Sequence, residues 1–314
     1  MKIPTFEDII RAHERIKPFI HHTPVFTSQS INLITGGDLY FKCENLQKAG
    51  AFKFRGACNS VFSLSDQEAA RGVCTHSSGN HGAALALAAR MRGIQAYIVM
   101  PETAPEIKKK AVAGYGAQIT FCKPTLEARE ATLAGIASRT GATEIHPYNN
   151  FQVICGQGTV AKELIEESGP FDIILCPVGG GGLLSGTSIT TKSLNPDTLV
   201  IATEPEGADD AYRSFHAKKL IPSVNPKTIA DGLLTSVGEL NFRIIRRNTD
   251  EIVTVTEQGI IKAMRMVWER MKTVIEPSSA VPLAAIIENK VDVGNKKTGI
   301  ILSGGNVDLE KLPF

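Results

Sequence analysis

The sequence VCTHSSGNHGAALALAARM, residues 73–91, decides the fold of this chain. Its first four residues are typical of a buried strand, and a helix is predicted over Gly82–Met91 after a polar turn. The same pattern then repeats, with strands predicted at Ala96–Met100 and Gln118–Phe121 and helices at Glu106–Ala113 and Leu126–Arg139. Because strands that alternate with helices form a parallel sheet covered on both faces, the sequence predicts an α/β unit.

A second alternating set follows the first. Its predicted elements are a helix at Thr159–Glu167, a strand at Asp172–Pro177, a helix at Leu184–Lys192 and a strand at Leu199–Thr203. We therefore predict two parallel-sheet α/β domains: a large one made of residues 1–70 and 150–314, and a small one, residues 71–149, inserted in it. The first stretch, with a predicted helix at Phe6–Pro18 and a predicted strand at Leu39–Cys43, is expected to pack on the second unit.

The composition argues against several classes of function. The 314 residues are 43% hydrophobic and 21% charged, as in ordinary soluble proteins, and the net charge of +2 argues against binding to nucleic acid or to a membrane surface. No apolar run reaches the roughly 18 residues of a membrane span and the start of the chain lacks a signal core, so we expect a cytoplasmic protein. The six cysteines form no Cys-x-x-Cys pair and are expected to be reduced core residues.

Lys53 is held between two aromatic residues in Phe52-Lys53-Phe54. A lysine amine in water has a pKa of about 10.4 and is protonated, but apolar neighbours lower that pKa and free the lone pair for Schiff-base chemistry. Taken alone, the stretch also suits a strand whose lysine faces water while both phenylalanines face the core. Together with the motifs below, it makes Lys53 the candidate anchor of a covalent cofactor.

Four consecutive glycines, Gly179 to Gly182, follow a predicted strand and precede a predicted helix. Backbone N–H groups can converge there without obstruction, and the start of the helix adds positive potential, so the loop is predicted to bind a phosphate group. It is not a P-loop, because no Gly-Lys-Ser/Thr follows, and Leu184 replaces the third glycine of a dinucleotide fingerprint. A nucleotide-binding interpretation stays open, since Glu204 lies where a ribose-binding acid would be expected.

Small polar residues crowd the end of the predicted strand Val73–His76, in Ser77-Ser78-Gly79-Asn80-His81. Open α/β sheets bind ligands at the carboxyl ends of their strands, and helix-capping positions offer free N–H donors to a carboxylate. A serine hydrolase is disfavoured, because no Gly-x-Ser-x-Gly elbow surrounds Ser78. The cluster is therefore predicted to bind a substrate carboxylate.

Two further segments carry polar groups at predicted strand ends. The acidic loop Glu204-Pro205-Glu206-Gly207-Ala208-Asp209-Asp210 suits either a Mg²⁺ or Ca²⁺ site or a solvated surface loop, and the sequence favours neither. Near the end of the chain, the apolar residues 300–302 run into Ser303-Gly304-Gly305-Asn306. An imine-forming lysine, a phosphate cradle and a carboxylate site together describe a pyridoxal phosphate site for an amino acid.

Four segments carry a resemblance to one enzyme family. They are, in chain order, Phe52-Lys53-Phe54-Arg55-Gly56, Ser77-Ser78-Gly79-Asn80-His81, Gly179-Gly180-Gly181-Gly182-Leu183 and Ser303-Gly304-Gly305-Asn306. The chain resembles the fold-type II pyridoxal phosphate enzymes, in the group of serine/threonine dehydratases and, most closely, serine racemases. The likeness covers nearly the whole chain, including residues 228–232 and 268–272. It implies a tryptophan synthase beta-like fold with the active site in the cleft between the two domains.

The resemblance also implies roles for individual residues. Lys53 would bind the cofactor covalently and act as the base on one face of the substrate Cα. The remaining expected contacts are Phe52 beside the ring, Asn80 at the ring hydroxyl, Ser303 at the pyridine nitrogen, Gly179, Gly180, Gly181, Gly182 and Leu183 at the phosphate, and Ser77, Ser78, Asn80 and His81 at the substrate carboxylate. Because a neutral hydroxyl at the nitrogen makes the ring a weaker electron sink, elimination or reprotonation is expected rather than transamination.

Two further residues separate the members of this group. Racemisation needs a second acid/base on the face opposite Lys53, and Ser78 is the candidate, because many dehydratases have alanine there. Tyr148 departs from the racemase pattern, which has Asn directly after His-Pro, and aromatic residues there are common in dehydratases. This departure leaves open the balance between racemisation and elimination.

The resemblance implies a small amino acid as substrate. We expect a racemase and dehydratase of serine, with threonine as a further substrate; the alternative is a threonine or 3-hydroxyaspartate dehydratase. A non-catalytic nucleotide-binding regulator is the alternative from another class. Glu204, Asp210 and the carbonyl of Ala208 match a divalent-cation site for Mg²⁺ or Ca²⁺. A homodimer is also expected, and the sequence leaves open whether a nucleotide effector binds at its interface. The missing C-terminal regulatory domain argues against inhibition by isoleucine.

Overall fold

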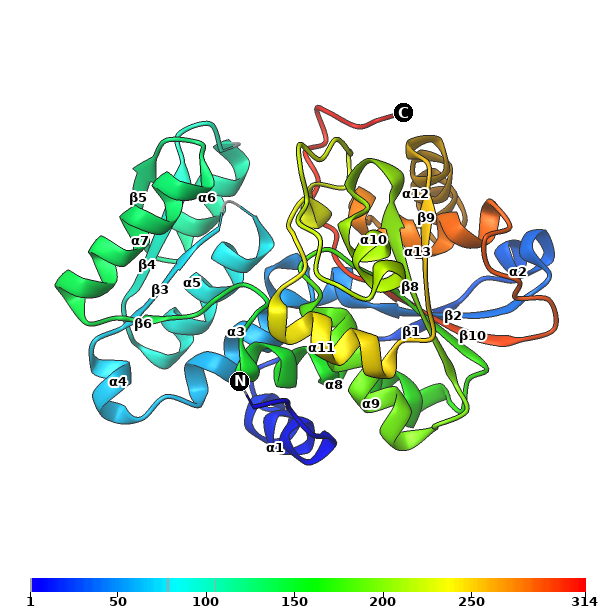
Figure 1. The fold of residues 1–314 in the computed structure, drawn as a ribbon, viewed down its shortest axis with the longest axis horizontal. Helices are drawn as coiled ribbons and strands as arrows, with labels where there is room; N and C mark the ends of the chain where they lie inside the picture. The colour runs from blue at the N-terminus through cyan, green and yellow to red at the C-terminus, as the bar shows by residue number, and fades with distance from the viewer. Residues whose placement is uncertain (1, 78, 105) are drawn as a thin grey trace.

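The computed structural model describes residues 2–77, 79–104 and 106–314, and its strands form two sheets (Figure 1). The six-stranded sheet has the order β1-β2-β10-β7-β8-β9, and the four-stranded sheet has the order β5-β4-β3-β6. Every neighbouring pair is parallel except β1 and β2, which are antiparallel. The expected α/β architecture with two parallel sheets is therefore confirmed, with one antiparallel edge strand added to the larger sheet.

The sequence separates the two sheets cleanly. The strands of the larger sheet are β1 (Val25–Thr27), β2 (Asp38–Cys43), β7 (Ile173–Pro177), β8 (Leu199–Pro205), β9 (Glu251–Val255) and β10 (Lys297–Leu302). Those of the smaller sheet are β3 (Val73–His76), β4 (Ala96–Pro101), β5 (Gln118–Cys122) and β6 (Thr143–Glu144). All strands of the smaller sheet thus come from one continuous stretch, in agreement with an inserted domain, while the domain boundaries at residues 71 and 149 stay a prediction.

Helices cover both sheets and connect their strands (Figure 1). In the first half of the chain they are α1 (Phe6–Ile16), α2 (Gln29–Thr35), α3 (Lys53–Phe62), α4 (Asp66–Ala70), α5 (Asn80–Arg92), α6 (Glu106–Gly114) and α7 (Leu126–Thr140). In the second half they are α8 (Phe151–Ser168), α9 (Gly182–Leu194), α10 (Asp210–Ala217), α11 (Glu239–Asn248), α12 (Glu257–Met271) and α13 (Pro277–Ile287). In the described part of the chain, no helix combines the length and the apolarity of a membrane span.

Strand β10 shows how the core of the larger sheet is divided. Its side chains alternate between two faces, so Ile300 and Leu302 pack in the cluster that contains residues of α12 and α13. Ile301 points the other way, into the cluster that contains Leu183 and Leu184 of α9. Since both faces are covered, the strand reads as a continuous apolar run, as expected for a central parallel strand. The polar groups of the site therefore follow at the end of the strand, beyond Leu302.

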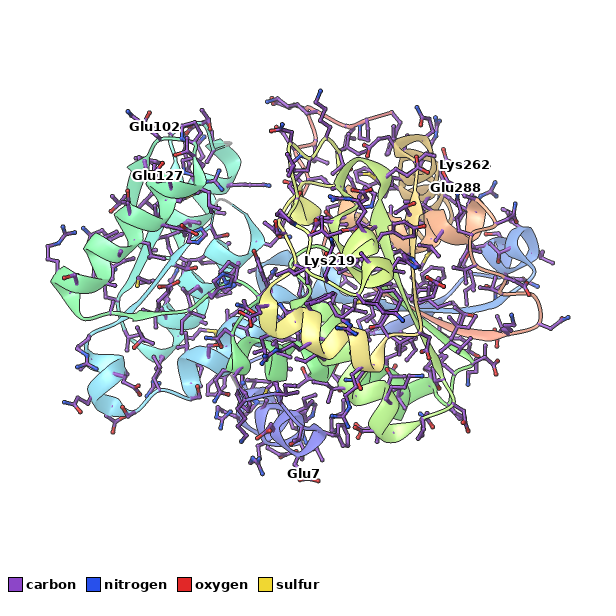
Figure 2. The ribbon with its side chains drawn as sticks, in the orientation of Figure 1. Glu7, Glu102, Glu127, Lys219, Lys262 and Glu288 are labelled. Carbon is purple, nitrogen blue, oxygen red and sulfur yellow. The ribbon has the colours of Figure 1, made fainter. Side chains whose placement is uncertain are left out.

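Many charged side chains lie on the outside of these layers. Glu7, Glu127 and Lys262 are exposed and extend from the outer faces of their helices (Figure 2).

One network of buried charges is organised by Arg55. Its guanidinium group donates to Glu44 and Glu163 at 2.7 Å from each, and all three side chains are buried. Ion pairs that lie out of water in this way are strongly destabilised when one partner is removed.

Two predictions about local structure are corrected. Helix α8 begins at Phe151 rather than Thr159, because the side chain of Asn150 caps it by accepting a hydrogen bond from the N–H of Val153 at 3.0 Å. Lys53 starts helix α3 and does not lie in a strand, so the interpretation in which its side chain alternates with the phenylalanines across a sheet is wrong.

Candidate active site

Lys53 lies where the chain leaves the end of the larger sheet. The N–H of Phe52 donates to the carbonyl of Ser303 at 3.0 Å, and Ala51 pairs with Gly304, so helix α3 begins beside the end of β10. The lysine amine donates to the carbonyl of Pro147 at 3.0 Å. Lys53 as a whole is half-buried, but burial of its amine lowers the pKa to about 8, against an opposing effect of the Glu276 carboxylate. A substantial fraction of the amine is therefore neutral near pH 7 to 8 and able to attack a carbonyl.

The glycine loop forms the start of helix α9. Gly181 is the N-cap residue in the left-handed conformation, with φ of 88°, which a residue with a side chain adopts only under strain. The amides of the first helical turn have no acceptor within the helix and carry the positive end of its dipole. The loop therefore has the geometry expected of an anion cradle.

Tyr148 packs against this cradle. A Cβ atom on Gly180 would lie 2.4 Å from the Tyr148 ring, and one on Gly182 would lie 3.0 Å from the Tyr148 Cβ. The same ring lies 5.9 Å from the amine of Lys53. Tyr148 therefore contacts the glycine loop and also lies next to the Lys53 amine.

The polar turn after β3 lies at the start of helix α5. The Ser77 hydroxyl accepts hydrogen bonds from the N–H groups of Gly79 and Gly82, at 3.3 and 3.2 Å. The Asn80 amide donates to both oxygens of Glu276, at 2.9 and 3.0 Å, and its oxygen accepts a bond from Asn306 at 3.0 Å. Asn80 thus joins the smaller sheet's first helix to the larger sheet's last loop. Ser78 lies outside the described residues.

The histidines of the site are neutral. Burial, with Lys53 nearby, lowers the pKa of His81 to about 3, and burial lowers that of His146 to about 4. His81 Nε2 lies 3.1 Å from the carbonyl of Ile145, so in the neutral ring this nitrogen carries the proton and donates. Its Nδ1 atom is buried without a partner in the described part of the chain, and is free to accept a hydrogen bond from a ligand.

Ser303 lies at the end of β10, directly before Gly304. Its hydroxyl is 3.1 Å from that of Ser279, which also donates to the carbonyl of Gly304 at 2.6 Å. Both serines are buried and belong to a neutral hydroxyl pair. A ring nitrogen that faced Ser303 would meet a hydroxyl group.

Glu276 is a residue of the site that the sequence did not indicate. It precedes helix α13, is 3% exposed, and burial raises the pKa of its carboxyl to about 7. A Cβ atom on Gly304 would lie 2.7 Å from its Oε1 atom, so the carboxylate lies against the loop that carries Ser303. The only signal in the sequence is one acidic residue before a Pro-Ser-Ser helix start, and this pattern also suits a helix cap on the surface.

The acidic loop lies between the end of β8 and the start of helix α10. Both oxygens of Glu204 accept backbone N–H groups, of Ala211 and Tyr212, and Glu204 and Asp210 are fully buried. Burial raises the pKa of both carboxyls, that of Asp210 to about 6. One Asp210 oxygen accepts the N–H of Val237 at 2.9 Å, and the other is buried without a partner among the described residues.

These carboxylates fit a cation better than a solvated loop. Two buried acids close together, one with a free oxygen, are stabilised either by a proton or by a positive ion. The described residues hold no group of three or more His, Cys, Asp or Glu side chains around one point, so a carbonyl such as that of Ala208 would have to complete the ligand set. Of the two alternatives that the sequence left open, the solvated loop does not hold for Glu204 and Asp210, because both side chains are buried.

The structure brings together the groups that a pyridoxal phosphate site requires. Tyr148 lies between the glycine loop and the Lys53 amine. Glu276 contacts Asn80 and the loop that carries Ser303, at the carboxyl end of β10. The glycine loop is a cradle that a Cβ atom would fill, and the Lys53 amine has the low pKa needed for an imine. Pyridoxal phosphate, when bound, supplies an electron-withdrawing ring that stabilises negative charge at the substrate Cα.

Comparisons with known proteins identify the family of the chain. Residues 16–304 match the family described as "Pyridoxal-phosphate dependent enzyme". The chain is 52% identical to a beta-hydroxyaspartate dehydratase of Paracoccus denitrificans over 100% of both chains, and 54% identical to a serine racemase of Dictyostelium discoideum over 99% of this chain and 98% of that one. It superposes on the structure of maize serine racemase with a TM-score of 0.96 and 45% identity, over 98% and 95% of the two chains. The chain therefore belongs to the pyridoxal-phosphate dependent enzymes and is itself an enzyme of this kind.

Proposed function

We propose that this enzyme interconverts L- and D-serine and eliminates water from serine, giving the 2-oxo acid and ammonia, with threonine as a further substrate. The observation that carries the proposal is the buried Lys53 amine with a pKa of about 8, between the glycine cradle and the polar turn after β3. The similarity to serine racemases over nearly the full length supports the choice of substrate.

In this proposal, Lys53 takes the proton from the substrate Cα. Its neutral form can accept that proton near pH 7 to 8, and the carbonyl of Pro147 receives a hydrogen bond from the resulting ammonium group. The substrate carboxylate lies at the turn of Ser77 and Asn80, where the start of α5 supplies N–H donors. His81 is neutral, so its role there is hydrogen bonding and positioning, and it adds no positive charge.

Neutral partners at the ring also support this chemistry. Ser303 would face the ring nitrogen with a hydroxyl group, whose neighbour is a second hydroxyl group, that of Ser279. A ring held by a neutral hydroxyl would be a weaker electron sink, so loss of the β-hydroxyl group or uptake of a proton at the substrate Cα would be favoured. We assign the proton donor on the second face to Ser78.

One assay tests the function. Purified enzyme with L-serine should form both pyruvate and D-serine, counted in the same tube, and Lys53→Ala should abolish both products and the absorbance band of the lysine-bound cofactor. A variant without the amine that retained near wild-type turnover would refute the assignment of Lys53. A wild-type protein that binds the cofactor but makes neither product would refute the proposal that serine is the substrate.

A dehydratase of 3-hydroxyaspartate or threonine, without racemase activity, is the second candidate. It is supported by the similarity to the Paracoccus denitrificans dehydratase over the full length of both chains and by the aromatic Tyr148 in the wall of the site. Both candidates predict a 2-oxo acid, but only the first predicts D-serine. Parallel assays with 3-hydroxyaspartate, threonine and serine, each scored as kcat/KM, separate them. Membership of an enzyme family removes the support for a non-catalytic regulator.

We also propose a divalent cation, Mg²⁺ or Ca²⁺, at Glu204, Asp210 and the carbonyl of Ala208. The support is the pair of fully buried carboxylates and the free oxygen of Asp210. Oxygen ligands of this kind suit both ions. In this proposal the cation acts through the protein and takes no direct part in the chemistry at Lys53.

A homodimer with a nucleotide effector completes the proposal. Leu33 and Ile34 on helix α2 are 80% and 56% exposed, an apolar pair that a second copy would cover. A pocket of about 490 Å³ is lined by Lys311 and Tyr115, which suit a nucleotide, and by Lys108, which is paired with Asp231; Asn80 also lines it, so the pocket opens onto the candidate active site. The cytoplasmic location expected from the composition stays a prediction.

A further inference from the structure

We propose that residues 237–241 couple the cation site to the phosphate cradle, and that Asn241 is the residue that positions the cradle. The inference rests on the proposed cofactor and cation sites. It adds a residue and a segment to which neither the sequence motifs nor the expected ligand sets assign a role. We call residues 237–241 the coupling segment.

Asn241 joins three parts of the site through one buried amide. Its Nδ2 atom donates to the carbonyl of Gly180 at 2.6 Å and to that of Tyr148 at 3.2 Å, and its Oδ1 atom accepts the hydroxyl of Ser185 at 3.1 Å. The side chain is 0% exposed. Both N–H donors and the oxygen of the amide are thus used, so a side chain without an amide could not replace it without loss of a bond.

The bond to Gly180 fixes the direction of a cradle amide. A trans peptide is planar, so the carbonyl of Gly180 and the N–H of Gly181 point in opposite directions. With the carbonyl held by Asn241, that N–H points away from Asn241, and the carbonyl cannot rotate toward a bound phosphate and repel it. Because Gly180 and Gly181 have no side chains to hold this peptide, an external clamp is needed.

The other end of the coupling segment contacts the acidic loop. The N–H of Val237 donates to Asp210 at 2.9 Å, and the N–H of the next residue, Gly238, donates to the same Gly180 carbonyl at 3.2 Å. A Cβ atom on Gly238 would lie 2.7 Å from the Asn149 side chain, so the segment has little room to move independently. Two consecutive N–H groups therefore bind the cation site and the cradle.

This geometry predicts reciprocal linkage between the two ligands. A cation that binds the free oxygen of Asp210 orders the carboxylate that Val237 contacts, and thereby orders Gly238 and the Gly180 carbonyl. Since coupling between two sites is symmetric, the cation should raise the affinity for the cofactor by the factor by which the cofactor raises the affinity for the cation. Couplings of this kind are typically about 5-fold or more.

The experiment measures cofactor affinity in the apoprotein. Pyridoxal phosphate is titrated into wild type, Asn241→Ala and Asn241→Asp by absorbance, with and without MgCl₂, and Mg²⁺ binding to wild type and Asp210→Ala is measured by calorimetry. Asn241→Asp keeps the shape but loses the donors, so it serves if the alanine variant fails to fold. Asn59→Ala is the matched control, because Asn59 is also 0% exposed and donates to the carbonyl of Gln152 at 2.7 Å, but does not contact the cradle.

We expect Mg²⁺ to tighten cofactor binding about 5-fold or more in wild type and in Asn59→Ala. Without the cation, both Asn241 variants should bind the cofactor at least about 10-fold more weakly, as expected when a bond in a buried network is lost, and should lose most of the Mg²⁺ effect. Unchanged cofactor affinity in both variants overturns the role of Asn241. Mg²⁺ that binds but leaves cofactor affinity unchanged overturns the coupling.

Failure of the proposed function gives a different result. If calorimetry detects no Mg²⁺ binding, the cation site is wrong and the coupling falls with it, while the role of Asn241 is still decided by the cation-free titrations. If wild type does not bind pyridoxal phosphate, the assignment of the cradle is wrong.

Discussion

Replacement of Gly180 by alanine isolates the contact between the glycine loop and Tyr148. The new Cβ atom would lie 2.4 Å from two ring atoms of Tyr148, and the backbone φ of Gly180 is outside the left-handed region, so the obstacle is this contact and not backbone strain. Carbon atoms pack at about 3.5–4.0 Å, and the ring or the loop must therefore move by about 1 Å.

The cost of this movement follows from the packing of the site. Tyr148 cannot retreat freely, because its ring packs edge-on against His146 with 4.6 Å between ring centroids and its carbonyl is held by Asn241. Overpacking of this size costs about 1–3 kcal/mol. If the loop yields instead of the ring, the same energy appears as a loss of cofactor affinity of about 5- to 150-fold.

The assay combines urea unfolding of the apoprotein with a titration of pyridoxal phosphate. We expect Gly180→Ala to lower the sum of the free energy of unfolding and the free energy of cofactor binding by about 1–3 kcal/mol. The loss should be smaller when Gly180→Ala is made in a Tyr148→Ala background. Gly135→Ala is the control, since no atom lies within 4 Å of its Cβ position in helix α7. A Gly180→Ala enzyme that unfolds and binds the cofactor like wild type, or a cost unaffected by the loss of the Tyr148 ring, would refute the packing argument.

Three further predictions test other parts of the molecule. Ser78→Ala should abolish D-serine formation while pyruvate formation from L-serine survives, and an unchanged product ratio would contradict the role on the second face. Arg55→Met should lower the free energy of unfolding by about 3–5 kcal/mol, because Glu44 and Glu163 lose their buried partner. In wild type the arginine lowers the pKa of Glu163 to about 2 despite its burial, so this stabilisation is complete above about pH 4.5 and is lost as the pH falls toward 2, which urea melts across that range would detect. The pH dependence expected from Glu276 runs in the opposite direction. Because burial raises its pKa to about 7, the free energy of unfolding of the apoprotein should fall as the pH rises from about 4.5 to 7. Glu276→Gln should lose less stability over the same pH range.

The sequence by itself determined the α/β architecture and the four motifs of the candidate site. Strand and helix signals are local, since they depend on the spacing of apolar residues and on capping residues, and they placed β3, β4, β5 and β7 to within one residue at each end. The motifs at Ser77 to His81, Gly179 to Gly182 and Ser303 follow strands β3, β7 and β10, and open α/β sheets bind ligands at the carboxyl ends of their strands. The similarity to pyridoxal phosphate enzymes could therefore be stated from residues alone.

Only the tertiary structure showed which residues position these motifs. Glu276, Asn241 and Arg55 act through partners that lie far away in the sequence, such as Asn80, Gly180 and Glu163. Nothing in the residue types near Glu276 and Asn241 marks these two residues, because a glutamate before a proline or an asparagine in a helix is usually solvated. Their function comes from burial, which shifts the pKa of Glu276 and makes each hydrogen bond of Asn241 costly to lose, and burial is a property of the packed chain and not of a local pattern.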